Sequence, residues 1–367
     1  MKNLIKILRS VYTNLSKFQV FCLGLLGITV VSAWIFNLDS SLTEKIYHQL
    51  IYSKLRWIWD FGISWIPIPV LYIWLFGLLA FFAILIYKLR NHQLSYIKLI
   101  INLLCLISFH YCWFYWAWGF NYHRVPLGIR WQLYKEISDD EFVESLKKQS
   151  QLVDSMRIAD STDLDNPDFN AFKMESEIRS LVNDFLKSND FLSFSRIRCR
   201  NLSPPGFLLV WSTSGVYLPF CGESQIDAGL SVYSKPFTMA HELSHGMGWT
   251  HEGDCNLIAY LSCRHSENPY IRYAAELNYW RYLLNAASRN YPEIYKQMLS
   301  QANSKVKHDL QMIQEANNRY PEILPQLRDW FYEWYLKQNG IQSGQKSYAE
   351  IIPMVINYDK KRRTTFQ

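Results

Sequence analysis

Two histidines and a glutamate fall within five consecutive residues, His241-Glu242-Leu243-Ser244-His245. On a helix, residues four apart share one face, so His241 and His245 can direct both imidazoles at a single metal ion. Zinc suits such a pair because it binds histidine nitrogen and brings the pKa of its bound water near neutrality. Glu242 adjoins the pair and can accept a proton from that water and later pass it to a leaving amine. The spacing predicts a zinc-dependent peptidase, a hydrolase with Glu242 as its catalytic base.

A surface helix that carries a histidine pair and a glutamate by chance is the alternative interpretation. The flanking residues argue against it, because Phe237, Met239, Ala240 and Leu243 make this helix partly apolar and therefore partly buried. Unpaired histidine and glutamate side chains are costly in such a place. A buried helix of this kind needs a metal ion or an ion-pair network to satisfy it.

Zinc needs a third protein ligand, and two neighbouring residues compete for that place. His251 would complete HExxHxxGxxH, the spacing of metzincin peptidases. Glu252 begins the stretch EGDCNLIA, which resembles the ExxA(D/N)xxA helix of gluzincin peptidases, whose glutamate binds zinc. Metzincins also need a methionine turn beneath the metal, and no methionine occurs between Glu252 and Met298. We expect Glu252 as the third ligand, with His251 as the alternative.

Further residues could support the ligands or contact a substrate. Asn256 is placed to buttress a zinc-bound histidine, and Asp254 is a weaker candidate for the third ligand or a supporting residue. Glu223 could bind a substrate amine or be ordinary surface charge, and the strand that leads to it could align a peptide by backbone pairing, with Gly222 allowing close approach. A core strand with an ordinary turn explains that segment equally well. Candidates for stabilising a tetrahedral oxyanion are Tyr260, His265 and Tyr273.

The elements that must position these residues are mostly helical. Periodicity after Arg124 predicts an α+β, zincin-like domain with a small β-sheet directly before the HExxH helix. The expected strands are residues 207–212 and 215–220. The expected helices are residues 138–156, 170–186, 237–247, 253–263, 267–288, 291–318 and 320–338.

The first third of the chain is crowded with apolar and aromatic residues. Three stretches are each about one bilayer thick as helices, at residues 18–37, 66–87 and 97–118. A cleaved signal peptide is the rival interpretation of the first stretch. We therefore expect a basic cytoplasmic N-terminus at residues 1–17, a membrane region at 18–118 and an extracytoplasmic peptidase domain at 119–367. The orientation follows from the basic residues before the first span and in the loop after the second.

The net charge of +6 comes largely from short basic tails, so we expect a lipid bilayer and a peptide or protein substrate as partners and no nucleic acid. The seven cysteines form no disulfide framework of the small secreted kind. A bridge between Cys199 and Cys221 is one option in an oxidising compartment. Proteolysis within the membrane is disfavoured because the HExxH segment lies well after the last span.

Several stretches resemble the bacterial membrane family catalogued as domain of unknown function 3810. The matching residues are 118–124, 217–223, 236–240, 252–263, 268–270 and 272–273. The resemblance implies a multi-pass protein of the bacterial inner membrane and a zinc peptidase of the HExxH type. The family has alanine where Cys255 stands and a short residue other than histidine where His251 stands, which again favours Glu252. A non-catalytic zinc-binding module, either a sensor or an envelope scaffold, is the alternative function.

Overall fold

The computed structural model describes residues 16–159, 164, 170–341 and 344–365. Within these residues the chain forms two compact units. The described residues of the first fall within Met1–Arg56, Val70–Arg124 and Pro219–Cys221, and those of the second within Trp57–Pro69, Val125–Leu218 and Gly222–Gln367. The expected basic segment at residues 1–17 lies outside the described residues apart from its last two. The expected membrane region, 18–118, thus includes residues 57–69, which pack with the second unit.

The first unit contains the three helices that are long and apolar enough to cross a membrane, as the sequence predicts. They are α2 (Lys17–Leu38), α5 (Val70–Arg90) and α6 (Tyr96–Ala117). Ser16 begins α2 with a capping box, in which its hydroxyl accepts from the Gln19 N–H and its own N–H donates to the Gln19 side chain. Most side chains of the three helices stay exposed, as helices in contact with lipid require.

Shorter helices complete the first unit and lead into the second. They are α3 (Ser40–Leu42), the π-helix η1 (Thr43–Tyr52), the 3₁₀-helix η2 (Gly119–His123) and α4 (Ser53–Gly62), which crosses the division after Arg56. Two polar contacts, one buried and one part-buried, fix this part of the first unit. His48 Nδ1 lies 2.9 Å from Asn121 Oδ1, and Arg124 Nε donates to Glu44 Oε2 over 2.9 Å.

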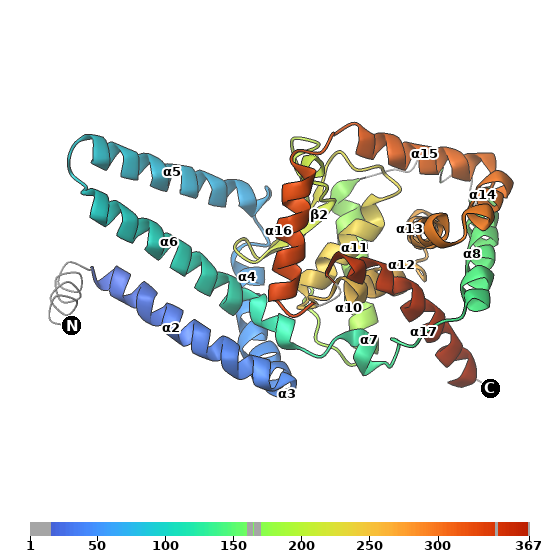
Figure 1. Ribbon diagram of the computed structural model, residues 1–367, viewed down its shortest axis with the longest axis horizontal. Coiled ribbons are helices and arrows are strands. Elements are labelled where there is room, and N and C mark those ends of the chain that lie inside the picture. The colour runs from blue at the N-terminus through green and yellow to red at the C-terminus, as the bar shows by residue number, and fades with distance from the viewer. Residues whose placement is uncertain (1–15, 160–163, 165–169, 342–343, 366–367) are drawn as a thin grey trace. The chain divides into compact units, whose positions relative to one another are not determined.

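The second unit is mostly helical and contains a small sheet, as expected (Figure 1). Before the sheet come α7 (Leu127–Arg130), α8 (Asp139–Ala159) and α10 (Ala171–Ser188). After the sheet come α11 (Lys235–Gly246), α12 (Glu252–Cys263), α13 (Pro269–Asn290), α14 (Pro292–Gln301), α15 (Ser304–Asn318), α16 (Pro325–Gln338), the 3₁₀-helix η4 (Gly344–Glu350) and α17 (Ile351–Thr365). Every residue of α12 is buried, because α10, α11, α13, α17 and η4 all pack against it.

The sheet has three strands in the order β1-β3-β2, from β1 (Cys199–Leu202), β2 (Gly215–Leu218) and β3 (Glu223–Asp227). Strand β3 is fully buried between a parallel neighbour, β1, and an antiparallel neighbour, β2. Strand β2 therefore lies at the edge of the sheet. The Ser224 hydroxyl on β3 donates to the Glu242 carbonyl over 2.6 Å and so fastens the sheet to α11.

Three local predictions are wrong. Residues 207–212 form no strand but a loop with a 3₁₀ turn, η3 (Leu209–Trp211), because the Asp227 carboxylate accepts N–H bonds from this segment. The expected helix 291–318 is two helices, since Asn303 caps a new helix at Ser304. The expected 215–220 strand ends at Leu218. The chain then turns at Gly222, which has a positive φ of +64° and packs against Trp59.

All seven cysteines are free thiols, so the optional Cys199–Cys221 bridge is not present.

Candidate metal centre

Helix α11 presents its two histidines on one face. Pro236 lies in its first turn, where a proline is tolerated because that N–H has no helical partner. His241 and His245 are one turn apart, and their Nε2 atoms lie 3.1 Å from one another. After α11 ends, Gly248 adopts a left-handed φ of +87° and reverses the chain, so that α12 begins beside the histidines at Glu252. A turn of five residues therefore brings Glu252 to the histidine pair.

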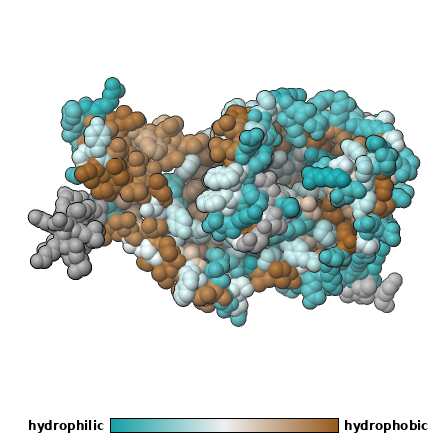
Figure 2. Space-filling model, in the orientation of Figure 1, coloured by the Kyte–Doolittle hydropathy of each residue, from teal (hydrophilic) through white to brown (hydrophobic). Residues whose placement is uncertain are grey.

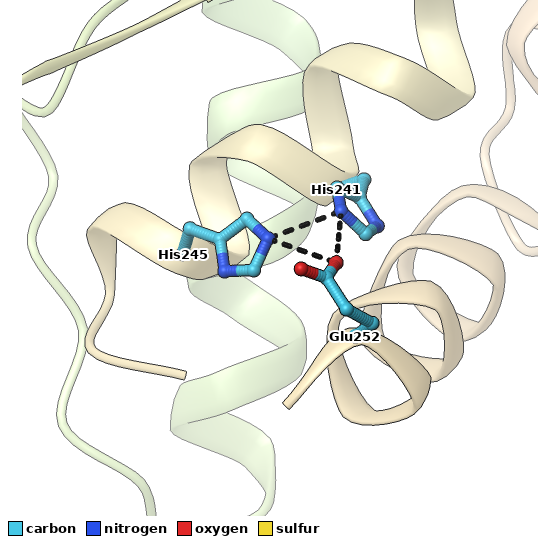
Figure 3. A group of neighbouring side chains, drawn as sticks. All are labelled: His241, His245 and Glu252. Atoms are coloured by element: carbon cyan, nitrogen blue, oxygen red, sulfur yellow. Dashed lines mark hydrogen bonds and ion pairs between the residues drawn. The ribbon is translucent and has the colours of Figure 1, made fainter. Parts of the chain in front are cut away.

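Three ligand atoms converge at this point, from His241, His245 and Glu252. Figure 3 shows both rings of α11 directed at the Glu252 carboxylate. Glu252 Oε2 lies 3.2 Å from His241 Nε2 and 3.3 Å from His245 Nε2. All three side chains are buried. The structure thus groups Glu252, and not His251, with the histidine pair.

The opposite ring nitrogens show which atoms carry protons. His241 Nδ1 lies 2.8 Å from Asn256 Oδ1, and His245 Nδ1 lies 2.9 Å from the Trp249 carbonyl oxygen. Both oxygens can only accept, so both Nδ1 atoms must donate, and each ring turns its Nε2 into the cluster, where a ring without a second proton offers a lone pair. Hydrogen-bonded histidine of this kind is the usual support of a metal ligand.

The cluster leaves one buried oxygen unsatisfied. Two imidazole nitrogens and a carboxylate oxygen face one another, and Glu252 Oε2 has no hydrogen-bond partner among the described residues although it is buried. Burial lowers the pKa of His245, but the neighbouring Cys255 and Glu252 outweigh it and raise that pKa well above its usual value. Either a proton on His245 or a bound cation would compensate the negative charge of the Glu252 carboxylate. Two imidazoles and one carboxylate are a ligand set of catalytic zinc, so the residues fit that ion.

The second oxygen of Glu252 is held by the C-terminal part of the unit. The Tyr332 hydroxyl on α16 donates to Glu252 Oε1 over 3.0 Å and lies 2.8 Å from the Tyr348 hydroxyl on η4. Tyr348 also stacks on the His241 ring, and its carbonyl accepts from Asn256 Nδ2 over 3.1 Å. Sequence analysis did not identify either tyrosine. Both are far from the motif in sequence, and nothing distinguishes them among 24 tyrosines.

Glu242 lies on the side of α11 that faces the sheet. A methyl group at Gly215 on β2 would come within 2.7 Å of Glu242 Cγ and 2.8 Å of Glu242 Oε1, so only glycine leaves room for this carboxylate. Burial raises the pKa of the Glu242 carboxyl above its usual value, while the two histidines and a backbone hydrogen bond from Tyr217 oppose that rise. Glu242 is therefore next to the two histidines in sequence and beside the edge strand, without belonging to the cluster of His241, His245 and Glu252.

Of the remaining predicted site residues, one contacts the cluster of His241, His245 and Glu252, and the others do not. Asn256 joins it through the hydrogen bond from His241 Nδ1 to its Oδ1. Asp254 instead accepts the N–H groups of Leu127 and Gly128, over 2.7 and 3.0 Å, and fixes the start of α7. His251 faces away from the cluster, with its Nδ1 3.3 Å from the Tyr134 hydroxyl.

Most of the candidates for substrate contact form hydrogen bonds with residues outside the cluster. Glu223 accepts from Arg200 Nε over 2.7 Å within the sheet. The Tyr260 hydroxyl donates to Glu276, and the Tyr273 hydroxyl donates to Asp309. His265 is exposed beyond the end of α12. These contacts are structural.

Comparison with known proteins gives one match. The family model described as "Protein of unknown function (DUF3810)" matches residues 47–356, which include every residue of the cluster and both supporting tyrosines. No curated protein and no solved structure matches the chain.

Proposed function

Since this chain belongs to the family described as DUF3810, for which no function is known, we propose from the site itself that the protein is a membrane-anchored, zinc-dependent peptidase. The observation that carries the proposal is the convergence of two imidazole nitrogens and one buried carboxylate oxygen. His241, His245 and Glu252 would hold the zinc. When bound, zinc supplies a Lewis acid that activates water and polarises a carbonyl.

The residues around the cluster suit hydrolysis of an amide. Glu242 is buried beside the ligands and would accept a proton from the attacking water and deliver it to the leaving amine. A raised pKa brings a carboxyl closer to the pH at which it both accepts and donates a proton efficiently. Strand β2 lies at the sheet edge beside Glu242, where an extended peptide can pair with the backbone. This neighbourhood favours a peptide as the substrate.

The three helices that are apolar enough to cross a membrane would anchor the proposed catalytic unit there. The distribution of basic residues around these spans favours an extracytoplasmic position for that unit, at the inner membrane of a bacterium. Peptides or proteins outside the cytoplasm would then be the substrates.

A non-catalytic zinc module, either a sensor or an envelope scaffold, is the second candidate. It is favoured by the burial of the ligands, because His241 is 7% and His245 8% exposed. Structural zinc sites are shielded from solvent but take four protein ligands, so this candidate needs one ligand more than the three that the described residues bring together.

Four forms of the full-length protein separate the candidates: wild type, Glu242→Gln, Glu252→Ala and His251→Ala. Metal content is measured by mass spectrometry, and cleavage is measured with a peptide library. We expect one zinc per chain in the wild type, in Glu242→Gln and in His251→Ala, and none in Glu252→Ala. Only the wild type and His251→Ala should cleave peptides.

A wild-type protein without zinc, or cleavage by Glu242→Gln at the wild-type rate, would refute the proposed peptidase. Stoichiometric zinc with no cleavage of any library peptide would support the non-catalytic module.

A further inference from the structure

Helix α16 turns an apolar face outward. Leu327, Trp330, Phe331 and Trp334 follow one another at intervals of three, one and three residues, which places them on a single face of the helix. They are 58%, 65%, 55% and 48% exposed, respectively. Hydrophobic side chains also gather on the surface at the upper end of α16 in Figure 2. Contiguous apolar surface of this kind marks a site of interaction in a soluble unit.

The opposite face of α16 is committed to the metal centre. Tyr332 points inward and donates to Glu252 Oε1 over 3.0 Å, and Leu336 is fully buried. Rotating the helix to bury its aromatic residues would break the bond to Glu252. The outward direction of the aromatic face is therefore fixed by the same contacts that hold the site together.

A second group of exposed aromatic residues belongs to the same compact unit. In the segment Trp57–Pro69, Trp57 is 60%, Phe61 48% and Trp65 73% exposed. This segment runs directly into α5, which begins at Val70 and is apolar enough to span a membrane. Exposed tryptophan just before a span is typical of the interface between lipid and water. The unit that contains α16 is thus joined through its own aromatic segment to a membrane surface.

We infer that the outward face of α16, formed by Leu327, Trp330, Phe331 and Trp334, lies in the headgroup region of the bilayer that the chain's spans cross. Tryptophan, phenylalanine and leucine on one face of a helix are the residues that insert at this depth. A bilayer is held beside this unit by a covalent connection at residues 69–70, so docking needs no encounter with a free partner. The covalent link to a span favours lipid over a second copy of the chain or another protein.

The inference has a consequence for substrate choice that rests on the proposed peptidase function. Because α16 contacts the bilayer on one face and Glu252 on the other, the metal centre would lie within about one helix diameter, ~10 Å, of the lipid surface. Membrane-proximal segments of proteins would then be the preferred substrates.

Spin labelling of the full-length protein in vesicles of phosphatidylethanolamine and phosphatidylglycerol tests the docking. Trp330→Cys carries the nitroxide, and Trp334→Cys is a second site should the first variant fold poorly. Lys296→Cys is the water-exposed control, since Lys296 is 69% exposed on α14, and Phe76→Cys is the lipid control, since Phe76 is 73% exposed on α5. The seven native thiols are buried, so the label is selective. Collisions with oxygen report lipid, and collisions with a nickel chelate report water.

We expect the label at residue 330 to collide several-fold less with the nickel chelate than the label at 296, and to collide with oxygen nearly as often as the label at 76. Nickel collisions equal to those at residue 296 would show that α16 faces water and would overturn the inference. Shielding from both reagents would indicate a protein contact and would equally overturn it.

Activity tests the substrate consequence separately. The double variant Trp330→Glu and Trp334→Glu should cleave a soluble library peptide at the wild-type rate and a lipid-anchored copy of that peptide at least several-fold more slowly. Equal loss on both peptides would refute the preference for membrane-proximal substrates. A wild type that cleaves neither peptide would refute the peptidase and leave the spin-label result standing, so the two failures are distinguishable.

Discussion

Replacing Asn256 by alanine should weaken zinc binding without removing any ligand. Asn256 Oδ1 accepts from His241 Nδ1 over 2.8 Å and from the Tyr282 hydroxyl over 3.2 Å, while its Nδ2 donates to the Tyr348 carbonyl over 3.1 Å. Without that oxygen, the His241 ring can rotate and its Nδ1 proton is no longer fixed. Loss of such a partner weakens metal affinity about 10–100-fold. That range corresponds to ~1.4–2.8 kcal/mol of binding free energy.

The same change should lower the free energy of unfolding of the metal-free protein. Three hydrogen bonds are removed, one of them buried and two part-buried, and each contributes about 0.5–1.5 kcal/mol. We therefore expect a loss of ~1.5–4.5 kcal/mol, reduced where water enters the space. Asn256→Asp keeps the accepting oxygen and loses only the donor to Tyr348, so its zinc affinity should equal or exceed that of the wild type.

Competition with a chromogenic chelator measures the zinc affinity, at a temperature at which circular dichroism shows the metal-free variants to be folded. Ser262→Ala is the matched control, because Ser262 is also buried on α12 but bonds the Ile258 carbonyl, away from the site. An affinity of folded Asn256→Ala within twofold of the wild type would refute the role of Asn256. Equal weakening in Ser262→Ala would show that the effect comes from general loss of stability.

Three further outcomes follow from contacts away from the ligands. Gly215→Ala should lower peptide hydrolysis about 100-fold or more through displacement of Glu242, a general base, yet leave zinc content unchanged; equal activity would show that Glu242 tolerates the methyl group. Burial raises the pKa of Cys263 to about 12, so mass spectrometry should find it unalkylated at pH 8 until denaturant is added, and rapid labelling of the folded protein would contradict its burial. Asp309→Ala should destabilise the protein by ~3–5 kcal/mol in denaturant titrations, because it leaves Arg157 buried without its carboxylate; a change below 1 kcal/mol would refute this.

Local sequence patterns predicted the histidine pair and its partner glutamate because the whole ligand set is local. Residues one helical turn apart share a face whatever the tertiary structure, so His241 and His245 needed only a helix. The sequence left Glu252 and His251 as alternatives for the proposed third ligand, and the turn at Gly248 places Glu252 beside the histidines. That turn starts α12 at Glu252 and directs the His251 ring toward Tyr134.

Local sequence patterns could not predict contacts between residues far apart in the chain. Tyr332 and Tyr348 reach Glu252 and His241 only because α16 and η4 fold back onto α12. The expected strand at residues 207–212 failed for a similar reason. Its apolar residues suit a strand, but the distant Asp227 carboxylate takes three of the local N–H groups and bends the segment into a loop.

During synthesis, the residues proposed to bind zinc emerge before the C-terminal helices that cover them. All three ligands lie between residues 241 and 252, whereas Tyr332, which holds the Glu252 carboxylate, is 80 residues further along. At about 5–20 residues per second, a ribosome needs ~4–16 s to add that length. A growing chain would therefore possess its complete ligand set, and could load zinc, well before its C-terminal helices arrive to cover it.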